Sequence, residues 1–256
     1  MPLYSQFVIG PPGSGKSTYC AAVRELLESN CRPVTLANFD PAAEFLPYSP
    51  DIDIRDLVNF KQLCSSDSCG PNGGLLRCFA VLEDNFSWLI ESLSKTSNLY
   101  LIIDFPGQIE LYLSCESIAK LIHRLQETFD LRAVVLNLID SNRCLESSSF
   151  LSSCLTSLSL LINLSLPFLS VLTKIDIFRD AQDCEIDFED ICKCENLATH
   201  MTVLTGTSTF VALHSAICSL LEDFNLVQFE MLSVKDPQLL AKVVKEADHA
   251  CGYMLR

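Results

Sequence analysis

The stretch that decides the fold is QFVIGPPGSGKS, residues 6–17. Its first residues are mostly apolar, as in a strand that is buried on both faces. The rest matches the pattern GxxxxGK[ST], which has a known mechanism only between a strand and a helix. Residues 16–29 supply that helix, because their apolar side chains recur at helical spacing. The sequence therefore predicts a phosphate-binding loop between the first strand and the first helix.

Each residue type in this loop has a chemical purpose. Glycines let backbone N–H groups turn inward as a nest for phosphate oxygens, and the following helix points its positive end at them. Lys16 would neutralise charge on the β- and γ-phosphates, and the Ser17 hydroxyl would ligate Mg²⁺. The nucleotide-binding residues expected here are Gly13, Ser14, Gly15, Lys16, Ser17 and Thr18.

Further apolar runs of strand length alternate with helical periods along the chain. The strand-like runs are 6–10, 33–39, 98–105, 131–140, 167–173 and a last one at 227–232. Helical periods occupy 16–29, 74–93, 113–129, 147–164 and a final segment that begins after Asp236 and ends near Gly252. This alternation predicts a three-layer α/β P-loop NTPase fold with a mainly parallel sheet and helical elaborations. We expect one domain over residues 1–256, with a Gly-Pro-Asn loop insertion near 60–76 and a helical elaboration near 178–228.

Residues at the ends of other strands are expected to complete the site. Asp104 ends a strand-like run and is followed by Pro-Gly-Gln, the pattern that puts an acid beside Mg²⁺; a turn cap is the alternative. Gly107 would offer its amide to the γ-phosphate, and Gln108 would orient an attacking water. Asp40 would reach the metal's water shell or the attacking water, or act as the N-cap of the next helix.

A third motif, Thr173-Lys174-Ile175-Asp176, concerns the base. The aspartate would accept from N1–H and the exocyclic amine of guanine, while the lysine stem lies along the ring. Adenine offers no such pair of donors on that edge. With threonine in place of the usual asparagine the motif alone leaves the base open, but after a phosphate loop and DxPGQ it favours guanine. Ser233 is a further candidate contact.

The composition limits the kind of partner. The 18 Lys and Arg against 32 Asp and Glu give a net charge of −14, so we expect no direct nucleic-acid binding. The 13 cysteines are odd in number, form no CxxC pair and follow no signal-peptide pattern, which favours a reducing compartment. A zinc site could be imagined at Cys184, Cys192, Cys194 and His200, but this spacing matches no common zinc pattern.

One stretch is long enough to raise the question of a membrane. Residues 147–173 carry no charge over 27 positions, which meets the length of a spanning helix. Nine serines and Pro167 interrupt the stretch, however. We interpret it as a buried helix, a break at the proline and a buried strand, and expect no membrane partner.

A glycine-rich segment, Gly70-Pro71-Asn72-Gly73-Gly74, lies between the phosphate loop and the Asp-x-Pro-Gly motif. Turn chemistry explains it without a function, because proline fixes φ and asparagine and glycine tolerate φ > 0. Taken alone, these residues favour the turn over a binding loop.

The motifs together resemble those of the GPN-loop GTPases. GPPGSGKSTYC, DPAAE, GPNGGL, DFPGQIELY and TKID occur in that family's order, over about residues 3–253. MPLYSQ and LIDSNRCLESSSF look most like the third eukaryotic paralogue, with the second next. The resemblance implies a dimeric, Mg²⁺-dependent GTPase in which Gly70, Pro71 and Asn72 cross to the partner's nucleotide. Asn72 would then present its amide to a phosphate or to the attacking water.

The resemblance also implies a full set of roles. The catalytic residues would be Lys16, Asp40, Asn72, Asp104 and Gln108. Ser17 would bind the metal directly, and Asp40 and Asp104 would do so indirectly. The nucleotide site would add Gly107, Thr173, Lys174 and Asp176. The expected partners are GTP and GDP, a second copy or another GPN-loop GTPase, and subunits or assembly factors of RNA polymerase II. The expected role is assembly and nuclear import of that polymerase, from the cytoplasm with shuttling to the nucleus.

Two rival functions remain open at this point. One is an assembly scaffold that binds nucleotide with little hydrolysis. The other is a P-loop small-molecule kinase, which would need an arginine-bearing lid, although Lys and Arg are sparse here.

Overall fold

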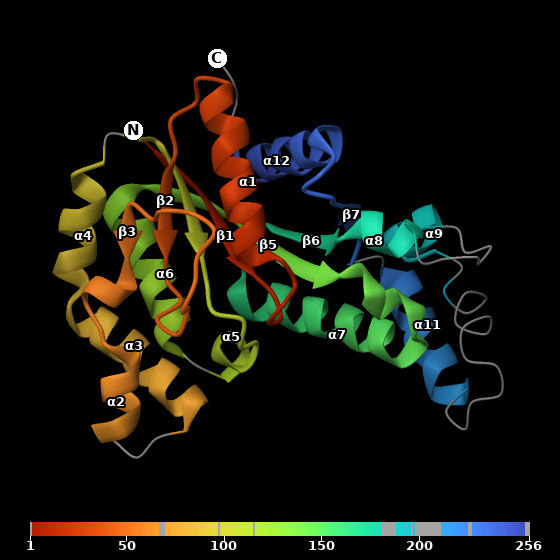
Figure 1. Cartoon of the computed structure of the whole chain (residues 1–256). Helices are drawn as coiled ribbons and strands as arrows, with labels where there is room; N and C mark the ends of the chain where they lie inside the picture. Colours follow the sequence, from red (N-terminus) through yellow and green to blue (C-terminus); the bar gives the residue numbers. More distant parts are fainter. Residues whose placement is uncertain are drawn as a thin grey trace.

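The central element is a parallel sheet in a computed structural model that describes residues 2–66, 70–96, 98–114, 116–180, 188–195, 197, 211–224 and 227–253. Within these residues seven strands lie in the order β3-β2-β4-β1-β5-β6-β7, and each neighbouring pair is parallel (Figure 1). The strands are β1 (Leu3–Ile9), β2 (Thr35–Asn38), β3 (Ile52–Asp53), β4 (Tyr100–Asp104), β5 (Leu131–Asp140), β6 (Phe168–Thr173) and β7 (Phe229–Met231). The predicted α/β class with a parallel sheet is confirmed.

Helices cover both faces of this sheet. Those that begin in the first half of the chain are α1 (Lys16–Ser29), α2 (Phe60–Ser66), α3 (Pro71–Asp84), α4 (Phe86–Ser94), α5 (Glu110–Ser114) and α6 (Glu116–Phe129). Those in the second half are α7 (Ser147–Leu164), α8 (Ile175–Asp180), α9 (Phe188–Lys193), α11 (Val211–Phe224) and α12 (Pro237–Cys251). Two short 3₁₀ turns, η1 (Ile54–Asp56) and η2 (Ser141–Leu145), follow β3 and β5.

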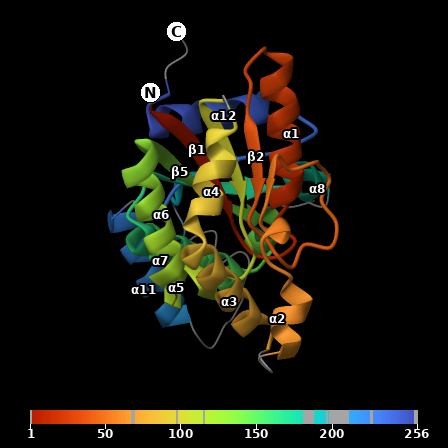
Figure 2. The ribbon, with the colours of Figure 1, turned by 90° about the vertical axis from the view of Figure 1, so that its left-hand side faces the viewer.

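The three layers follow from the alternation of side chains along each strand. In β1, Val8 belongs to the core that α1 and α12 cover. Its neighbours Phe7 and Ile9 belong to the core on the other face, which α3, α4 and α6 cover (Figure 2). Both faces of the strand are therefore buried, as expected for a run that is apolar at successive positions.

Two of the predicted helices are divided. The prediction of one continuous helix over 74–93 is wrong, because α3 ends before Asn85 and α4 begins after it. The Asn85 side-chain amide donates to the Val81 carbonyl (2.8 Å), which satisfies the last turn of α3 and ends it. The helix predicted over 113–129 begins earlier, as α5, and continues as α6. The strand β3 has two residues and left no hydrophobic pattern to detect.

The punctuation of the last helix is confirmed. The Asp236 carboxylate accepts from the backbone N–H of Gln238 (2.9 Å) and of Leu239 (3.4 Å). Pro237 is the first helical residue, and Gly252 ends the helix with φ of 75°. An aspartate N-cap, a proline at the first helical position and a glycine after the last turn are the residues that favour the start and the end of a helix.

The long uncharged stretch forms α7 and then β6, with a left-handed break at Ser165 (φ 49°). By length and composition alone, α7 is the one helix in the described part of the chain that could cross a membrane, which is weak evidence for a span. Of that helix 39% is buried, and Phe150, Cys154 and Leu160 lie in the core. The helix and the strand agree with the prediction, but the helix is only partly buried and the break begins at Ser165, two residues before Pro167.

Where it is described, the segment 178–228 is mainly helical, in the end of α8, in α9 and in α11. With α7 these helices enclose a third core cluster at the β6–β7 end of the sheet. Cys184 and His200 lie outside the described residues, whereas Cys192 and Cys194 are buried. The described residues contain no group of three or more His, Cys, Asp or Glu suited to a metal ion.

Candidate nucleotide-binding site

The loop between β1 and α1 has a backbone that only glycine adopts easily. Gly10, Gly13 and Gly15 have φ of 140°, 77° and 92°. A Cβ atom on Gly10 would also overlap the carbonyl oxygen of Leu138 in β5. Gly15 is the N-cap of α1, so the unpaired N–H groups of the first helical turn face the loop. This arrangement can receive an anion.

Lys16 lies inside the loop. Its ammonium donates to the carbonyl oxygens of Gly10 (3.0 Å) and Pro11 (3.1 Å), and the residue is buried. Burial lowers the pKa of Lys16, and the charges of Asp104 and Asp40 oppose that shift. The lysine therefore rests on neutral carbonyls with two carboxylates nearby, and phosphate oxygens would be stronger acceptors for it.

The hydroxyl groups of the loop differ in exposure. Ser14 is buried, and its Oγ has no hydrogen-bond partner among the described residues. Ser17 is half-buried, and Thr18 is exposed. Burial raises the pKa of Asp104, and Ser17 lies close enough to that carboxyl to oppose the rise.

Asp104 reaches the loop through the register of the sheet, because its Cα pairs with that of Val8, two residues before Gly10. Its Oδ2 accepts from the Tyr48 hydroxyl (2.9 Å), and its Oδ1 is buried with no partner in the described part of the chain. Burial raises the pKa of Asp104, and the nearby hydroxyls of Ser17 and Tyr48 oppose the rise. Burial and the Asp104 charge raise the pKa of Tyr48, which therefore keeps its proton and donates.

The two residues expected after this strand also lie at the loop. A Cβ atom on Gly107 would lie 2.9 Å from the Pro12 nitrogen and 3.0 Å from Lys16 Nζ, so its backbone touches the phosphate loop. Gln108 is half-buried, and its Oε1 is buried without a hydrogen-bond partner among the described residues. The tight approach explains why glycine stands at position 107.

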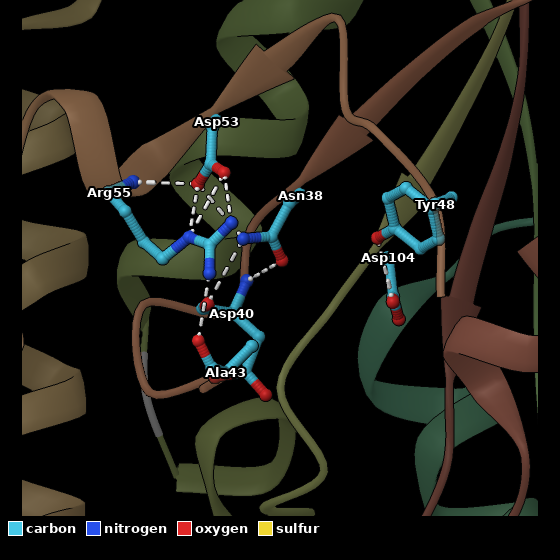
Figure 3. Close-up of polar contacts among 7 residues, drawn as sticks. All are labelled: Asn38, Asp40, Ala43, Tyr48, Asp53, Arg55 and Asp104. Atoms are coloured by element: carbon cyan, nitrogen blue, oxygen red, sulfur yellow. Dashed lines mark hydrogen bonds and ion pairs between the residues drawn. The ribbon is translucent and has the colours of Figure 1, made fainter. Parts of the chain in front are cut away.

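Asp40 sits in a tight turn after β2 that neighbouring side chains hold in place (Figure 3). Its carboxylate accepts from the Ala42 N–H (2.9 Å), so it caps this turn; the alternative prediction of a helix N-cap is wrong, because no helix of the described chain begins directly after Asp40. The Asn38 side chain accepts from the Asp40 N–H (3.0 Å) and donates to the Asp40 carbonyl (3.2 Å). Burial raises the pKa of Asp40, against the Ala42 N–H and the charge of Lys16.

A second set of side chains, which does not contact the Asp40 carboxylate, stabilises that turn. The Asn38 amide also donates to Asp53 (3.0 Å), whose carboxylate is gripped by the Arg55 guanidinium (Nε to Oδ1 2.9 Å). Arg55 donates in addition to the carbonyl of Ala43, the last residue of the turn (2.9 Å). Arg55 thus joins η1 to the turn that carries Asp40 (Figure 3).

These donors fit a hard cation. Mg²⁺ prefers oxygen ligands and keeps several waters, so it is usually held by one or two carboxylates together with substrate phosphates. The Ser17 hydroxyl, the unpartnered Asp104 oxygen and the Asp40 carboxylate are such donors at the mouth of an anion-binding loop. Burial raises the pKa of both carboxyls, and a cation beside them would stabilise their charged forms.

The base-recognition motif surrounds the other side of the loop. The Thr173 hydroxyl donates to the Ser14 carbonyl (2.8 Å) and the Lys174 ammonium to the Gly13 carbonyl (2.8 Å). Lys174, with φ of 60°, also pairs with Asp140 (2.6 Å). The motif therefore braces the phosphate loop as well as offering its carboxylate.

That carboxylate, Asp176, is half-buried and held by two residues after β7. The Ser233 hydroxyl donates to its Oδ1 (3.0 Å), and the Lys235 ammonium lies 2.8 Å from its Oδ2. Lys235, and then Ser233, lower the pKa of Asp176, so it is ionised and ready to accept. Ser233 reaches the motif through Asp176, where we had expected a contact with the base.

The Gly-Pro-Asn segment is the start of a helix. Gly70 is the N-cap of α3 with φ of −66° and ψ of 171°, and Pro71 is the first helical residue. Gly70, Pro71 and Asn72 are exposed, and α2 and the start of α3 project beyond the carboxyl end of the sheet (Figures 1 and 2). The structure of one chain therefore brings Lys16, Asp104, Gln108 and Asp40 together but leaves Asn72 outside that group.

Sequence reasoning missed the residues that hold the site. Three of them act on Asp104 and Asp40 from the end of β2, the loop after it and η1, namely Asn38, Tyr48 and Arg55. Asp140 and Lys235 act on the base motif. The signals available were Asp-Ile-Arg at 53–55 directly after a short strand and Ser-Val-Lys at 233–235 after the last one.

A parallel sheet with this loop, a carboxylate on the adjoining strand and a base motif on a later one defines a P-loop nucleoside triphosphatase. Three comparisons agree. A family model described as "Conserved hypothetical ATP binding protein" matches residues 8–253. The chain is 34% identical to GPN-loop GTPase QQT1 of Arabidopsis thaliana, covering 98% of this chain and 86% of that protein. It is 35% identical to a GPN-loop GTPase 2 homolog of Dictyostelium discoideum, covering 98% and 80%.

GPN-loop GTPase 3 of Danio rerio is 34% identical, with 99% of this chain and 89% of that protein covered. A GTPase in apo form from Pyrococcus abyssi has the same fold, with a TM-score of 0.75 at 23% identity and 97% of each chain covered. The chain therefore belongs to the GPN-loop GTPase family, and the predicted family and enzyme class are confirmed. The similar identities to relatives named 2 and 3 do not separate these two paralogues.

Proposed function

We propose that this chain binds GTP with Mg²⁺ at the phosphate loop and hydrolyses the nucleotide to GDP and phosphate. One observation carries the proposal. Ser14 Oγ, Asp104 Oδ1 and Gln108 Oε1 are buried without hydrogen-bond partners among the described residues, and all three belong to the predicted site. A buried unsatisfied group costs about 1–3 kcal/mol, so a ligand that satisfies them is strongly favoured.

The residues divide the reaction between them. Lys16 would exchange the carbonyls of Gly10 and Pro11 for phosphate oxygens, which are stronger acceptors. Gln108 would hold the attacking water through its free amide oxygen, and Asp40 would fix that water or the metal's water shell. Bound Mg²⁺ supplies neutralisation of the charge that develops on the phosphates. Because phosphoryl transfer is mostly positioning, such a site needs rigid supports rather than a strong base.

Guanine as the base is supported by the state of Asp176. Its pKa is lowered by Lys235, so the carboxylate is charged at neutral pH and can accept from two donors on one edge of guanine. The names of the relatives, which are GTPases, agree with this choice.

The dimer is supported by the glycines of the Gly-Pro-Asn segment. A Cβ atom on Gly74 would overlap Cys64 Sγ, so packing of α3 on α2 requires that glycine. A Cβ atom on Gly70 would meet nothing within 4 Å, and its backbone suits any residue. No feature of the described chain therefore requires glycine at 70. We propose that a partner does, in a homodimer or a heterodimer in which Asn72 reaches the partner's nucleotide.

We further propose the family's cellular role for this chain. It would bind subunits or assembly factors of RNA polymerase II, act in assembly and nuclear import of that enzyme, and reside in the cytoplasm with shuttling to the nucleus. The support is the motif resemblance over nearly the whole chain. Recovery of polymerase subunits and of a second GPN-loop GTPase with the tagged chain, dependent on Lys16, is the test.

Phosphate release without any acceptor tests the biochemical proposal. We expect the wild type to turn over GTP but not ATP. Gln108→Leu should still bind GTP, but its phosphate release should be at least about 10²-fold slower. Gln238→Leu, an exposed glutamine on α12, is the matched control and should behave as the wild type. Turnover of GTP that survives Gln108→Leu would refute the role of Gln108. Tight binding of GTP without turnover would favour the scaffold, and turnover only with an acceptor the kinase.

A further inference from the structure

The two oxygens of the Asp104 carboxylate have different surroundings. Oδ2 accepts a hydrogen bond from the Tyr48 hydroxyl at 2.9 Å. Oδ1 is buried without a partner in the described part of the chain, and the whole residue is 1% exposed. The phenol therefore distinguishes two otherwise equivalent oxygens of the carboxylate (Figure 3). What remains is one oxygen whose hydrogen-bonding capacity is unused.

Tyr48 is held in place independently of Asp104. Its ring packs against the core cluster beneath α1. The adjacent residue, Ser49, accepts through its carbonyl from Arg24 of α1 (2.7 Å). Two residues further on, the Asp51 carboxylate accepts from the Leu36 N–H of β2 (2.8 Å). The loop that carries Tyr48 is thus fixed to α1 and to the sheet, so its hydroxyl is a fixed donor.

We propose that Tyr48 is a positioning residue for the divalent cation of this site: by occupying Oδ2 it leaves Asp104 Oδ1 as the oxygen that the cation's water shell uses. The inference rests on the proposed function, since it takes Mg²⁺ with a guanine nucleotide as the ligand. Partners that orient a metal-binding carboxylate typically change metal affinity 10–100-fold when they are removed. Tyr48 would act on the cation alone and not on the base or the sugar of the nucleotide.

The alternative is that Tyr48 only ties its loop to the sheet. The two roles separate in their dependence on the cation. If the contact is only structural, its loss should weaken nucleotide binding with or without Mg²⁺ and should lower the stability of the protein. A lost positioning contact weakens the response to Mg²⁺ and leaves nucleotide binding in chelator unchanged.

The experiment uses the full chain with a fluorescent GDP, N-methylanthraniloyl-GDP. Its dissociation rate is measured in EDTA and across a Mg²⁺ titration for the wild type, for Tyr48→Phe and for Tyr4→Phe. Tyr4 is a matched control, because it is a half-buried tyrosine at the opposite end of β1 whose ring contacts Tyr253. We expect equal rates in EDTA, and a Mg²⁺ half-point about tenfold higher for Tyr48→Phe alone. Thermal unfolding should differ little between the two variants.

A double-mutant cycle with Asp104→Asn shows whether the effect passes through that carboxylate. In the Asp104→Asn background, Tyr48→Phe should shift the Mg²⁺ half-point no further. An unchanged half-point in Tyr48→Phe, an equal acceleration in EDTA, or a full effect in the Asp104→Asn background would each overturn the inference. A wild type that fails to retain the GDP analogue in either condition would instead overturn the proposed function, and the inference with it.

Discussion

The contact between Gly107 and the phosphate loop yields a quantitative prediction for Gly107→Ala. The added Cβ would lie 2.9 Å from the Pro12 nitrogen, 3.1 Å from its Cα and 3.0 Å from Lys16 Nζ. The lysine end can move, but the backbone of Pro12 cannot move cheaply. Because ordinary contact begins at 3.4 Å, the loop after β4 and the phosphate loop must separate by about 0.5 Å. Gly107 has no positive φ, so this separation is the whole effect.

That displacement should affect catalysis more than folding. Overpacking of this kind costs about 1–3 kcal/mol of stability. A misplacement of about 1 Å in an active site can cost about 10²-fold, so half of it should slow phosphate release roughly tenfold. Single-turnover release at saturating GTP, together with urea unfolding, measures both quantities.

The matched control is Gly252→Ala at the end of α12. Gly252 has φ of 75° but open space, with Arg132 3.9 Å from the added Cβ, so alanine there costs about 1–2 kcal/mol in backbone strain and touches no site residue. We expect similar losses of stability in the two variants and slower turnover in Gly107→Ala alone. Wild-type turnover in Gly107→Ala would refute the idea that this contact sets the distance between the two loops.

Three further predictions follow from the same site. Gly10→Ala adds backbone strain of about 1–3 kcal/mol to an overlap with the Leu138 carbonyl, so urea unfolding should show a larger loss than for Gly107→Ala. Arg55→Met frees the Ala43 carbonyl and should slow phosphate release several-fold, while stability falls by less than about 1 kcal/mol because the guanidinium is partly exposed. A loss of GTP binding in this variant would contradict the prediction. Burial raises the pKa of Asp104, so the folded state holds its proton more tightly and stability falls as pH rises from about 4 through the raised value. Asp104→Asn should therefore melt higher than the wild type at pH 7 without Mg²⁺, by a margin that shrinks towards pH 4.

The parts of the fold that could be predicted share one property: a long, periodic pattern of apolar residues with recognisable capping residues at its ends. The final helix is an example, since Asp236, Pro237 and Gly252 mark its ends and the structure uses each of them. The division of the predicted helix 74–93 could not be predicted in the same way, because it lies at one residue, Asn85, whose backbone leaves the helical conformation and whose side chain bonds the Val81 carbonyl. Apolar spacing continues across that break and hides it.

The residues of the candidate site also fall into a group that could be predicted from the sequence and a group that could not. Residues proposed to contact the nucleotide belong to short motifs whose chemistry is visible in the sequence, as with Lys16 and Asp104. The residues that hold them, such as Tyr48 and Arg55, depend on how a loop folds back over the sheet edge. Tyr48 lies 56 positions from the carboxylate it contacts, and no local spacing rule connects them.

The register of three strands explains why the two carboxylates meet at all. Asp104 pairs with Val8 of β1 on one side and with Asn38 of β2 on the other. Gly10 and Asp40 each lie two residues beyond those partners, so all three reach the same edge of the sheet before any side chain is placed. A shift of either pairing by one residue would turn the side chain of Asp104 to the opposite face. The register of these three strands is therefore also what assembles the chemistry of the site.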